Sequence, residues 1–194
     1  MSEKKRTKTQ RAILHAAKGL YEKHGVGGIP FDDIAETAGV CRTTVFNHFA
    51  DAGELQQAIA VAEIGELIEF GEQSSKSGLA LITALLDKLI DDTANYPRVM
   101  ARLTNATILG GESGRVGEIE RLIARNYELE FGKFTPDAAV SPELLAQMTM
   151  GLYYGQVNHL LAFGLPFEAE KVRRDMRAML DCLLKCRCFA KANA

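Results

Sequence analysis

Hydrophobic residues recur along the chain at intervals of three and four positions, the spacing that places them on one face of an α-helix. No stretch of useful length alternates hydrophobic and polar residues in the way a half-buried strand does. The first amphipathic pattern runs from Thr9 to His24, and Gly25, Gly27 and Gly28 end it. The pattern predicts an all-α fold.

Two short helices are predicted next. Pro30 suits the first turn of a helix whose inner face begins at Phe31 and which ends at Gly39. Residues 42–49 follow after a turn of two or three residues, with Val45 and Phe49 four positions apart on the inward face. The opposite face of this second helix is polar.

Longer helices are predicted in the remainder of the chain. A connecting helix covers 54–70, a Ser/Gly-rich joint covers 73–78, and further helices begin near Leu79, Pro97 and Val116. Ser141 precedes Pro142 as an N-cap precedes a first helical residue, and a last helix follows Gly164-Leu165-Pro166. We expect about nine helices, in a head of residues 1–52 and a body of residues 53–194.

Composition places the chain among ordinary globular proteins. Of its 194 residues, 47% are apolar and 25% are charged. No apolar run is long enough to cross a bilayer, and the basic start Lys4-Lys5-Arg6 is not followed by the apolar block of a signal peptide. We therefore expect a cytoplasmic protein with no membrane partner.

The net charge of −2 conceals an uneven distribution. The first 50 residues hold 8 Lys/Arg and 5 Asp/Glu, whereas the rest holds 15 and 20. A basic head on an acidic body suggests that a polyanion, if one binds, meets the N-terminal end. On charge alone, a solvated basic tail is an equal alternative.

The four cysteines do not predict a disulfide framework. Cys182, Cys186 and Cys188 lie close together near the end, Cys41 lies far from them, and no pair has CxxC spacing. Cys182 and Cys186 would share a helix face, but no histidine or second cysteine pair completes a metal site. We expect reduced thiols and no metal or other cofactor.

The pair of short helices is typical of a helix-turn-helix. In that motif a tight turn, here containing Gly39, sets the second helix across the first so that its exposed face enters the DNA major groove. Arg42, Thr43, Thr44, Asn47 and His48 supply hydrogen-bonding groups on that face. A merely solvated helix surface is the alternative reading of the same residues.

The stretch from Thr9 to about Ile59, centred on 31–40 and 44–49, resembles the TetR family of transcriptional regulators. This resemblance implies three N-terminal helices that bind operator DNA and a C-terminal helical body with a ligand pocket and a dimer interface. It further implies a repressor that a small-molecule effector releases from DNA. It identifies the DNA-contacting residues as Thr7, Lys8, Arg11, Arg42, Thr43, Thr44, Phe46, Asn47 and His48, with Arg42 the best candidate to read guanine.

Four positions depart from the family pattern. Pro30 replaces a hydroxyl residue that caps the second helix, Cys41 replaces a serine cap, Phe46 replaces a phosphate-binding tyrosine, and Ala52 replaces a lysine. None of these substitutes donates a strong hydrogen bond to phosphate. We expect weaker anchoring to the DNA backbone, greater dependence on the basic N-terminal residues, and a steep dependence of binding on salt.

The same resemblance suggests residues for the dimer and the pocket. Two late helices would pair with those of a second copy and set the recognition helices about 34–36 Å apart. The dimer candidates are Gly151, Tyr154, Gly155, Met176, Met179 and Leu183. The pocket candidates, at inward positions of the middle helices, are Met100, Leu103, Thr104, Thr107, Asn126, Tyr127, Tyr153, Asn158 and His159. Packing within one chain is the alternative for each of them.

Two other classes of function compete with a regulator. An enzyme requires a convergent set of reactive groups, and the chain has no HExxH, no glycine-rich phosphate loop and no Glu-x-x-His pair. We therefore expect no catalytic activity. A helical protein that binds only other proteins would carry a helix-turn-helix that no longer reads DNA.

For a regulator, we expect the effector to tilt the connecting helix that starts near Leu55 and so change the separation of the two heads.

Overall fold

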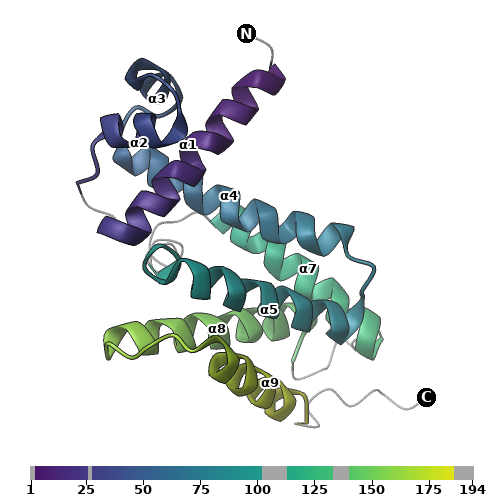
Figure 1. The fold of residues 1–194 in the computed structure, drawn as a ribbon. Coiled ribbons are helices and arrows are strands. Elements are labelled where there is room, and N and C mark those ends of the chain that lie inside the picture. The colour runs from purple at the N-terminus through teal and green to yellow at the C-terminus, as the bar shows by residue number, and fades with distance from the viewer. Residues whose placement is uncertain (1–2, 26–27, 102–112, 133–139, 186–194) are drawn as a thin grey trace.

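The computed structural model describes residues 3–25, 28–101, 113–132 and 140–185. Within these ranges the chain forms helices and no strand, which confirms the predicted all-α fold (Figure 1). The elements are α1 (Glu3–His24), α2 (Phe31–Ala38), α3 (Arg42–His48), α4 (Ala52–Gln73), α5 (Gly78–Asn95), α7 (Ser113–Phe131), α8 (Pro142–Ala162) and α9 (Ala169–Lys185). A further helical segment begins at Pro97 and is described as far as residue 101.

The helix boundaries differ from the predicted ones mainly at the N-terminal ends. Helix α1 begins at Glu3 and not at Thr9, so the basic start of the chain is helical and continues the first amphipathic helix. Pro30 lies one position before α2, as its N-cap. Ser141 caps α8 as predicted, since its side chain accepts a hydrogen bond from the Leu144 N–H at 3.2 Å.

The head has its own hydrophobic core. Helices α1, α2 and α3 contribute Ile13, Ala17, Tyr21, Ile34, Ala35 and Val45, and Phe49 at the C-cap of α3 joins them; all are buried. Leu55 and Ile59 from the first turns of α4 complete this core, together with Val99. The predicted boundary between residues 52 and 53 therefore falls at the start of a helix whose first turns pack in the head and whose later turns pack in the body.

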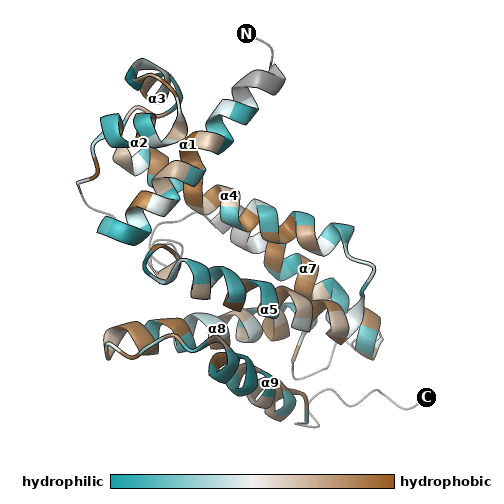
Figure 2. Ribbon diagram, viewed as in Figure 1, coloured by the Kyte–Doolittle hydropathy of each residue, from teal (hydrophilic) through white to brown (hydrophobic). Residues whose placement is uncertain are grey.

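The body forms a second core beneath α4. Leu67 of α4 packs there with buried apolar residues of α5, α7, α8 and α9. In Figure 1, α4 runs from the head along the body, α5 and α7 lie below it, and α8 and α9 form the layer farthest from the head. Figure 2 shows hydrophobic positions continuing to the C-terminal end of α8, where Phe163 is 70% exposed.

None of the helices in the described ranges is both long enough and apolar enough to cross a membrane.

Candidate nucleic-acid interface

The turn between α2 and α3 depends on Gly39. Its φ of 67° lies in the left-handed region, which glycine adopts without the steric cost that a Cβ brings. The Val40 N–H donates to the Ala35 carbonyl at 2.9 Å and the Gly39 N–H donates to the Glu36 carbonyl at 3.1 Å. These two bonds close the C-terminus of α2 in a Schellman arrangement. Helix α3 can therefore begin three residues later, at Arg42.

Helix α3 has one buried face and one exposed face. Val45 is fully buried, and Phe49, just beyond the helix, is 2% exposed, so both belong to the head core. On the opposite side, Arg42, Thr43, Phe46 and Asn47 are exposed. Thr44 and His48 are partly exposed. The structure therefore brings every α3 residue that was predicted to contact DNA onto one accessible surface.

Arg42 already has a protein partner on this surface. Its Nη1 donates to Asp32 Oδ2 of α2 at 2.7 Å, and the two side chains are 59% and 57% exposed. The guanidinium also lies over the Phe46 ring, 5.3 Å from the ring centroid, and Phe46 packs against Phe31 at 4.8 Å between centroids. These contacts position the guanidinium at the surface. Asp32 was not predicted as a partner of Arg42, although its place in the first turn of the preceding helix is visible in the sequence.

The caps of α2 and α3 are as weak as the sequence suggested. Neither Pro30 nor Cys41 makes a side-chain cap hydrogen bond. Cys41 Sγ instead lies 3.0 Å from the Thr44 hydroxyl, and that hydrogen bond lowers the pKa of the exposed thiol. The first turn of α3 is instead closed by the backbone, since the Thr44 N–H donates to the Cys41 carbonyl at 2.9 Å.

Helix α4 has a stronger N-terminal cap, which was not predicted from the sequence. Asp51 Oδ1 accepts from the Glu54 N–H at 2.8 Å, and Glu54 Oε2 accepts from the Ala50 N–H at 2.6 Å. This reciprocal arrangement is similar to a capping box, and the D-x-x-E spacing is its sequence signature. Ala52, where the family pattern has lysine, is the first residue of the helix and is exposed.

The basic residues predicted to contact phosphate lie near the start of α1. Thr7, Lys8 and Arg11 are exposed. Thr7 and Arg11 also line a groove of about 810 Å³ between α1 and α4, whose other wall includes Glu63, Glu66 and Glu69. Their contact with DNA stays a prediction.

The buried pocket candidates form hydrogen bonds inside the body. The Tyr127 hydroxyl lies 2.6 Å from that of Thr149, and the Tyr153 hydroxyl lies 2.5 Å from that of Thr93. Burial raises the pKa of both tyrosines, so both are neutral at physiological pH. Asn126 is 4% exposed and Oδ1 of its amide accepts from the Gly78 N–H at 2.9 Å, which fixes the start of α5.

The other pocket candidates are placed differently. Met100 is buried, Asn158 is partly exposed with a buried Oδ1, and Leu103, Thr104 and Thr107 lie outside the described residues. The inward position predicted for His159 is wrong, because the side chain is exposed. Its ring packs on Phe163, 4.8 Å away between centroids, at the surface end of α8. A ligand-binding role for this set stays a prediction.

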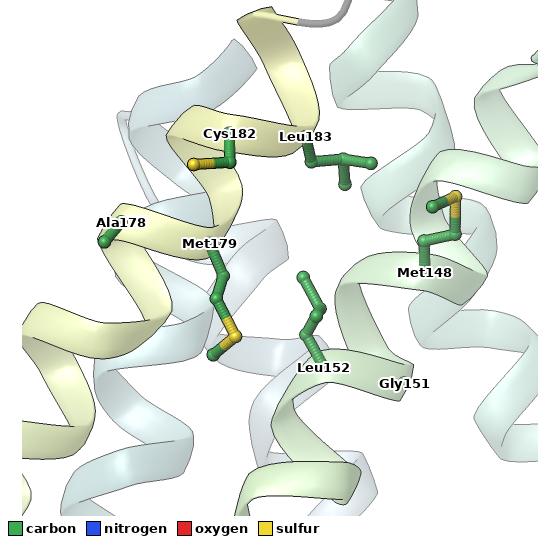
Figure 3. A pocket seen from close by; sticks show the side chains of 7 residues that line it. All are labelled: Met148, Gly151, Leu152, Ala178, Met179, Cys182 and Leu183. Atoms are coloured by element: carbon green, nitrogen blue, oxygen red, sulfur yellow. The ribbon is translucent and has the colours of Figure 1, made fainter.

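Three of the six dimer candidates, Gly151, Met179 and Leu183, line an apolar groove of about 540 Å³ between α8 and α9 (Figure 3). Its lining is Met148, Gly151, Leu152, Ala178, Met179, Cys182 and Leu183. In Figure 3, Met179 and Leu183 of α9 and Leu152 of α8 extend into the space between the two helices. Gly151 and Gly155 are exposed and Tyr154 is partly exposed, whereas Met176 is 1% exposed and packs in the body core.

The two thiols within the described ranges form no disulfide. Cys41 and Cys182 are both free and exposed, and Cys186 and Cys188 lie outside the described residues. Among the residues that the structure describes, no three His, Cys, Asp or Glu side chains are grouped as a metal ion would require.

Comparison with known proteins relates the head to one family. The family model described as "Bacterial regulatory proteins, tetR family" matches residues 13–59, from α1 through the helix-turn-helix into α4. The chain is 27% identical to the HTH-type transcriptional regulator TtgR of Pseudomonas putida over 57% of this chain and 48% of TtgR. It is 25% identical to the HTH-type transcriptional regulator AcrR of Shigella flexneri over 89% of this chain and 87% of AcrR. The aligned region therefore spans about half the length of TtgR and most of AcrR.

Solved structures share the whole fold. A tetR-family transcriptional regulator from Mesorhizobium loti MAFF303099 superposes with a TM-score of 0.67 at 19% identity, over 95% of this chain and 98% of that one. Thermus thermophilus FadR, described as a repressor and solved with lauroyl-CoA, gives 0.65 at 19% identity, over 95% and 98%. At these identities the likeness concerns the fold, and it includes the body as well as the head.

Proposed function

The chain belongs to the tetR family of bacterial regulatory proteins, and on that premise we propose that it is a ligand-responsive, sequence-specific DNA-binding repressor. In this proposal it acts in the cytoplasm as a homodimer without a catalytic role, and a small molecule bound in the body releases it from its operator. The observation that carries the proposal is the exposed polar surface of α3, held outward by Val45 and Phe49 in the core beneath it.

That surface suits a duplex for chemical reasons. Arg42 presents two or more N–H groups in a plane, which can bond to guanine O6 and N7 together, and Asn47 can bond to adenine N6 and N7 in the same manner. Thr7, Lys8 and Arg11 would add phosphate contacts that carry no sequence information.

The groove between α8 and α9 supports a homodimer. Leu144 and Met148 are 42% and 41% exposed, and they continue the apolar lining of the groove along α8. A Cβ added at Gly151 or Gly155 would meet no atom within 4 Å, so nothing inside the described chain requires glycine there. Glycine in a helix costs about 1 kcal/mol relative to alanine. The close approach of a helix from a second copy would explain both glycines.

An effector site in the body is supported by the buried tyrosines. Tyr127 and Tyr153 each place a hydroxyl among apolar side chains, where a polar group of a ligand could exchange with Thr149 or Thr93. FadR of Thermus thermophilus, which shares this fold, was solved with lauroyl-CoA. For this chain, the acidic body favours a neutral or cationic effector.

A DNA titration tests the proposal. The protein is added to the DNA upstream of its own gene and to a shuffled duplex of equal length, at about 50 and about 200 mM salt. We expect tight binding to the first duplex alone, with affinity falling by about 10³-fold or more between the two salts if the basic residues of α1 supply most phosphate contacts. Equal binding to both duplexes, or none, would instead favour a protein that binds only other proteins.

The release mechanism has its own test. Spin labels on the two α3 helices of a dimer report their separation with operator DNA and with a saturating effector. We expect the effector to move them away from the spacing of about 34–36 Å that successive major grooves require. An unchanged separation would rule out release by head movement.

A further inference from the structure

The last turns of α1 contact the body at the corner where α5 ends and the next helical segment begins. Lys18 and Glu22 lie four residues apart and so share one face of α1. Lys18 Nζ is 2.7 Å from Glu63 Oε2 of α4 and 4.1 Å from the centroid of the Tyr96 ring. The Glu22 side chain contacts the helical segment that begins at Pro97.

Glu22 caps that segment from another part of the chain. Its Oε2 accepts from the N–H groups of Arg98 and Val99, at 3.0 and 3.2 Å. These are the N–H groups that the first turn of a helix leaves without a partner, and Pro97 at the first position has none to satisfy. The preceding residue, Tyr96, cannot replace the carboxylate, because its side chain lies under Lys18.

Arg98 caps α1 in return. Its Nη1 donates to the carbonyl oxygens of Glu22 and Lys23, each at 3.5 Å. Helix α1 ends at His24, so these carbonyls are among the last four of the helix, where a cation is favoured. Glu22 and Arg98, 76 positions apart, therefore cap each other's helices: Glu22 caps the start of the segment that contains Arg98, and Arg98 caps the end of α1, which contains Glu22.

This corner is also part of the head core. Val99 is 2% exposed and packs with Ile13, Tyr21 and Leu55 of the head. The segment cannot shift along its axis without either moving α1 or leaving N–H groups and carbonyls unpaired, and each unpaired group costs free energy. The joint is therefore more rigid than packing alone would make it.

We propose that Glu22 and Arg98 form a reciprocal cap that couples the state of the body to the position of the DNA-binding head. The inference builds on the proposed function, because it names the residues through which the body would act on the operator-binding surface. Glu22 and Arg98 are positioning residues, since they contact neither DNA nor effector. Coupling is reciprocal in binding free energy, so an effector that weakens operator binding through this corner must itself bind more weakly when operator is bound. Operator binding should therefore also alter the corner.

The cap itself is tested in the free protein by hydrogen exchange at single amides. Glu22→Ala should speed exchange at Arg98 and Val99 by about fivefold, the loss expected for a helix cap. Glu128→Ala, an exposed glutamate of α7, is the matched control and should leave those amides unchanged. Unchanged exchange in Glu22→Ala would overturn the inference whether or not the protein binds DNA.

The coupling is tested with the duplex from upstream of its gene as the probe. Binding of this duplex should change exchange at Arg98 and Val99 in the wild type by about fivefold or more. In Glu22→Ala with Arg98→Ala, the duplex should still bind but the change at those amides should disappear. An equal change in wild type and variant, or no change in wild type despite binding, would overturn the coupling and leave the proposed function standing.

Failure of the cap, failure of the proposed function and failure of a variant to fold can be told apart. If the wild type binds no duplex, the proposed function fails, and the cap is still decided by exchange in the free protein. If Glu22→Ala does not fold, Glu22→Gln replaces it, because the amide oxygen can still accept one backbone N–H. That variant should give faster exchange than wild type at Arg98 and Val99, and a rate equal to wild type would contradict the role of the carboxylate.

Discussion

At the scale of single residues, the proposed DNA-binding surface contains an acidic residue, Asp32, that competes with DNA for Arg42. Asp32 holds Arg42 by an ion pair whose two side chains are both more than half exposed. Exposed pairs of this kind contribute about 0 to 1 kcal/mol, so DNA can displace Asp32 at small cost. The pair therefore orients Arg42 in the free protein without preventing its contact with a base or phosphate.

Removing this acid should strengthen operator binding. Asp32→Asn frees Arg42 and removes a negative charge near the phosphates, so we expect affinity to rise by up to about fivefold. Filter binding or fluorescence anisotropy measures the change. Asp33→Asn removes the neighbouring charge without touching the ion pair. An equal gain in both variants would mean that the gain comes from charge alone and that the pair has no part in it.

The weak cap of α3 gives a second prediction at this scale. Cys41→Ser supplies a hydroxyl oxygen that can accept a backbone N–H of the first turn, which the thiol does not do here. We expect the free energy of unfolding to rise by about 0.5 to about 1 kcal/mol, measured by urea denaturation. Cys41→Ala, which has no acceptor, should show no such gain. If alanine and serine stabilise equally, capping is not the cause.

At the scale of helices, the sequence predicted what local rules decide. Gly39 marked the end of α2, and Ser141 with Pro142 marked the start of α8, because each signal lies within a few residues of its effect. The alternation of Val45 and Phe49 with polar neighbours likewise predicted the two faces of α3. The polar candidates of α3 followed from these local features, whereas Phe46 was a candidate through the family resemblance alone.

Contacts between side chains on different helices could not be predicted from such local signals. Nothing local to Glu22 indicates that its carboxylate caps a helix 76 residues away. The place of Asp32 in the first turn of α2 was visible in the sequence, but it did not by itself identify Arg42 as the partner. Helical spacing placed His159 on the apolar face of its helix. Spacing does not say which other helix covers that face, and at His159 the side chain is exposed. Apolar residues of the body line either its own core or the groove between α8 and α9. The periodicity of apolar residues does not show which of the two a given residue lines.

The ion pair between Lys18 of α1 and Glu63 of α4 should make the stability of the protein depend on pH. Burial raises the pKa of Glu63 even though Lys18 is 2.7 Å away. A raised carboxyl pKa means that the folded state holds the proton more tightly, so stability from this group is full below about 4.3 and falls as pH rises above it.

A glutamine at this position removes the titration. The unfolding free energy of the wild type, minus that of Glu63→Gln, should therefore decrease as pH rises from about 4 towards neutrality. Urea denaturation of both proteins over this range measures the difference, with Glu72→Gln, an exposed glutamate of α4, as control. A difference that increases with pH would show that the attraction of Lys18 outweighs burial.

At the scale of the whole molecule, the two ends of the body have different surfaces. The head lies at one end, and the layer of α8 and α9 with its apolar groove lies at the other (Figure 1). A dimer formed through that groove would leave both heads free at the opposite end. One substitution in the groove should therefore remove the proposed dimer without altering the proposed DNA-binding surface.

Gly151→Arg is that substitution. Its Cβ meets no atom within 4 Å, so the fold should persist with an unchanged circular dichroism spectrum. The long charged side chain should block the groove, and we expect monomers in sedimentation equilibrium and a large loss of affinity for a two-site operator. Glu128→Arg adds the same side chain at an exposed position that does not line the groove. A dimeric Gly151→Arg protein would place the interface elsewhere.

The central claim is that the α3 surface reads DNA sequence, and a base-substitution scan of the bound site tests it most directly. Each base pair is replaced in turn, and affinity is measured for the wild type and for Arg42→Ala. We predict that the wild type loses about 1 to about 3 kcal/mol of binding free energy at one or more G·C pairs, and that Arg42→Ala is indifferent at those same pairs. A variant that keeps the base preferences of the wild type at every position would contradict the claim.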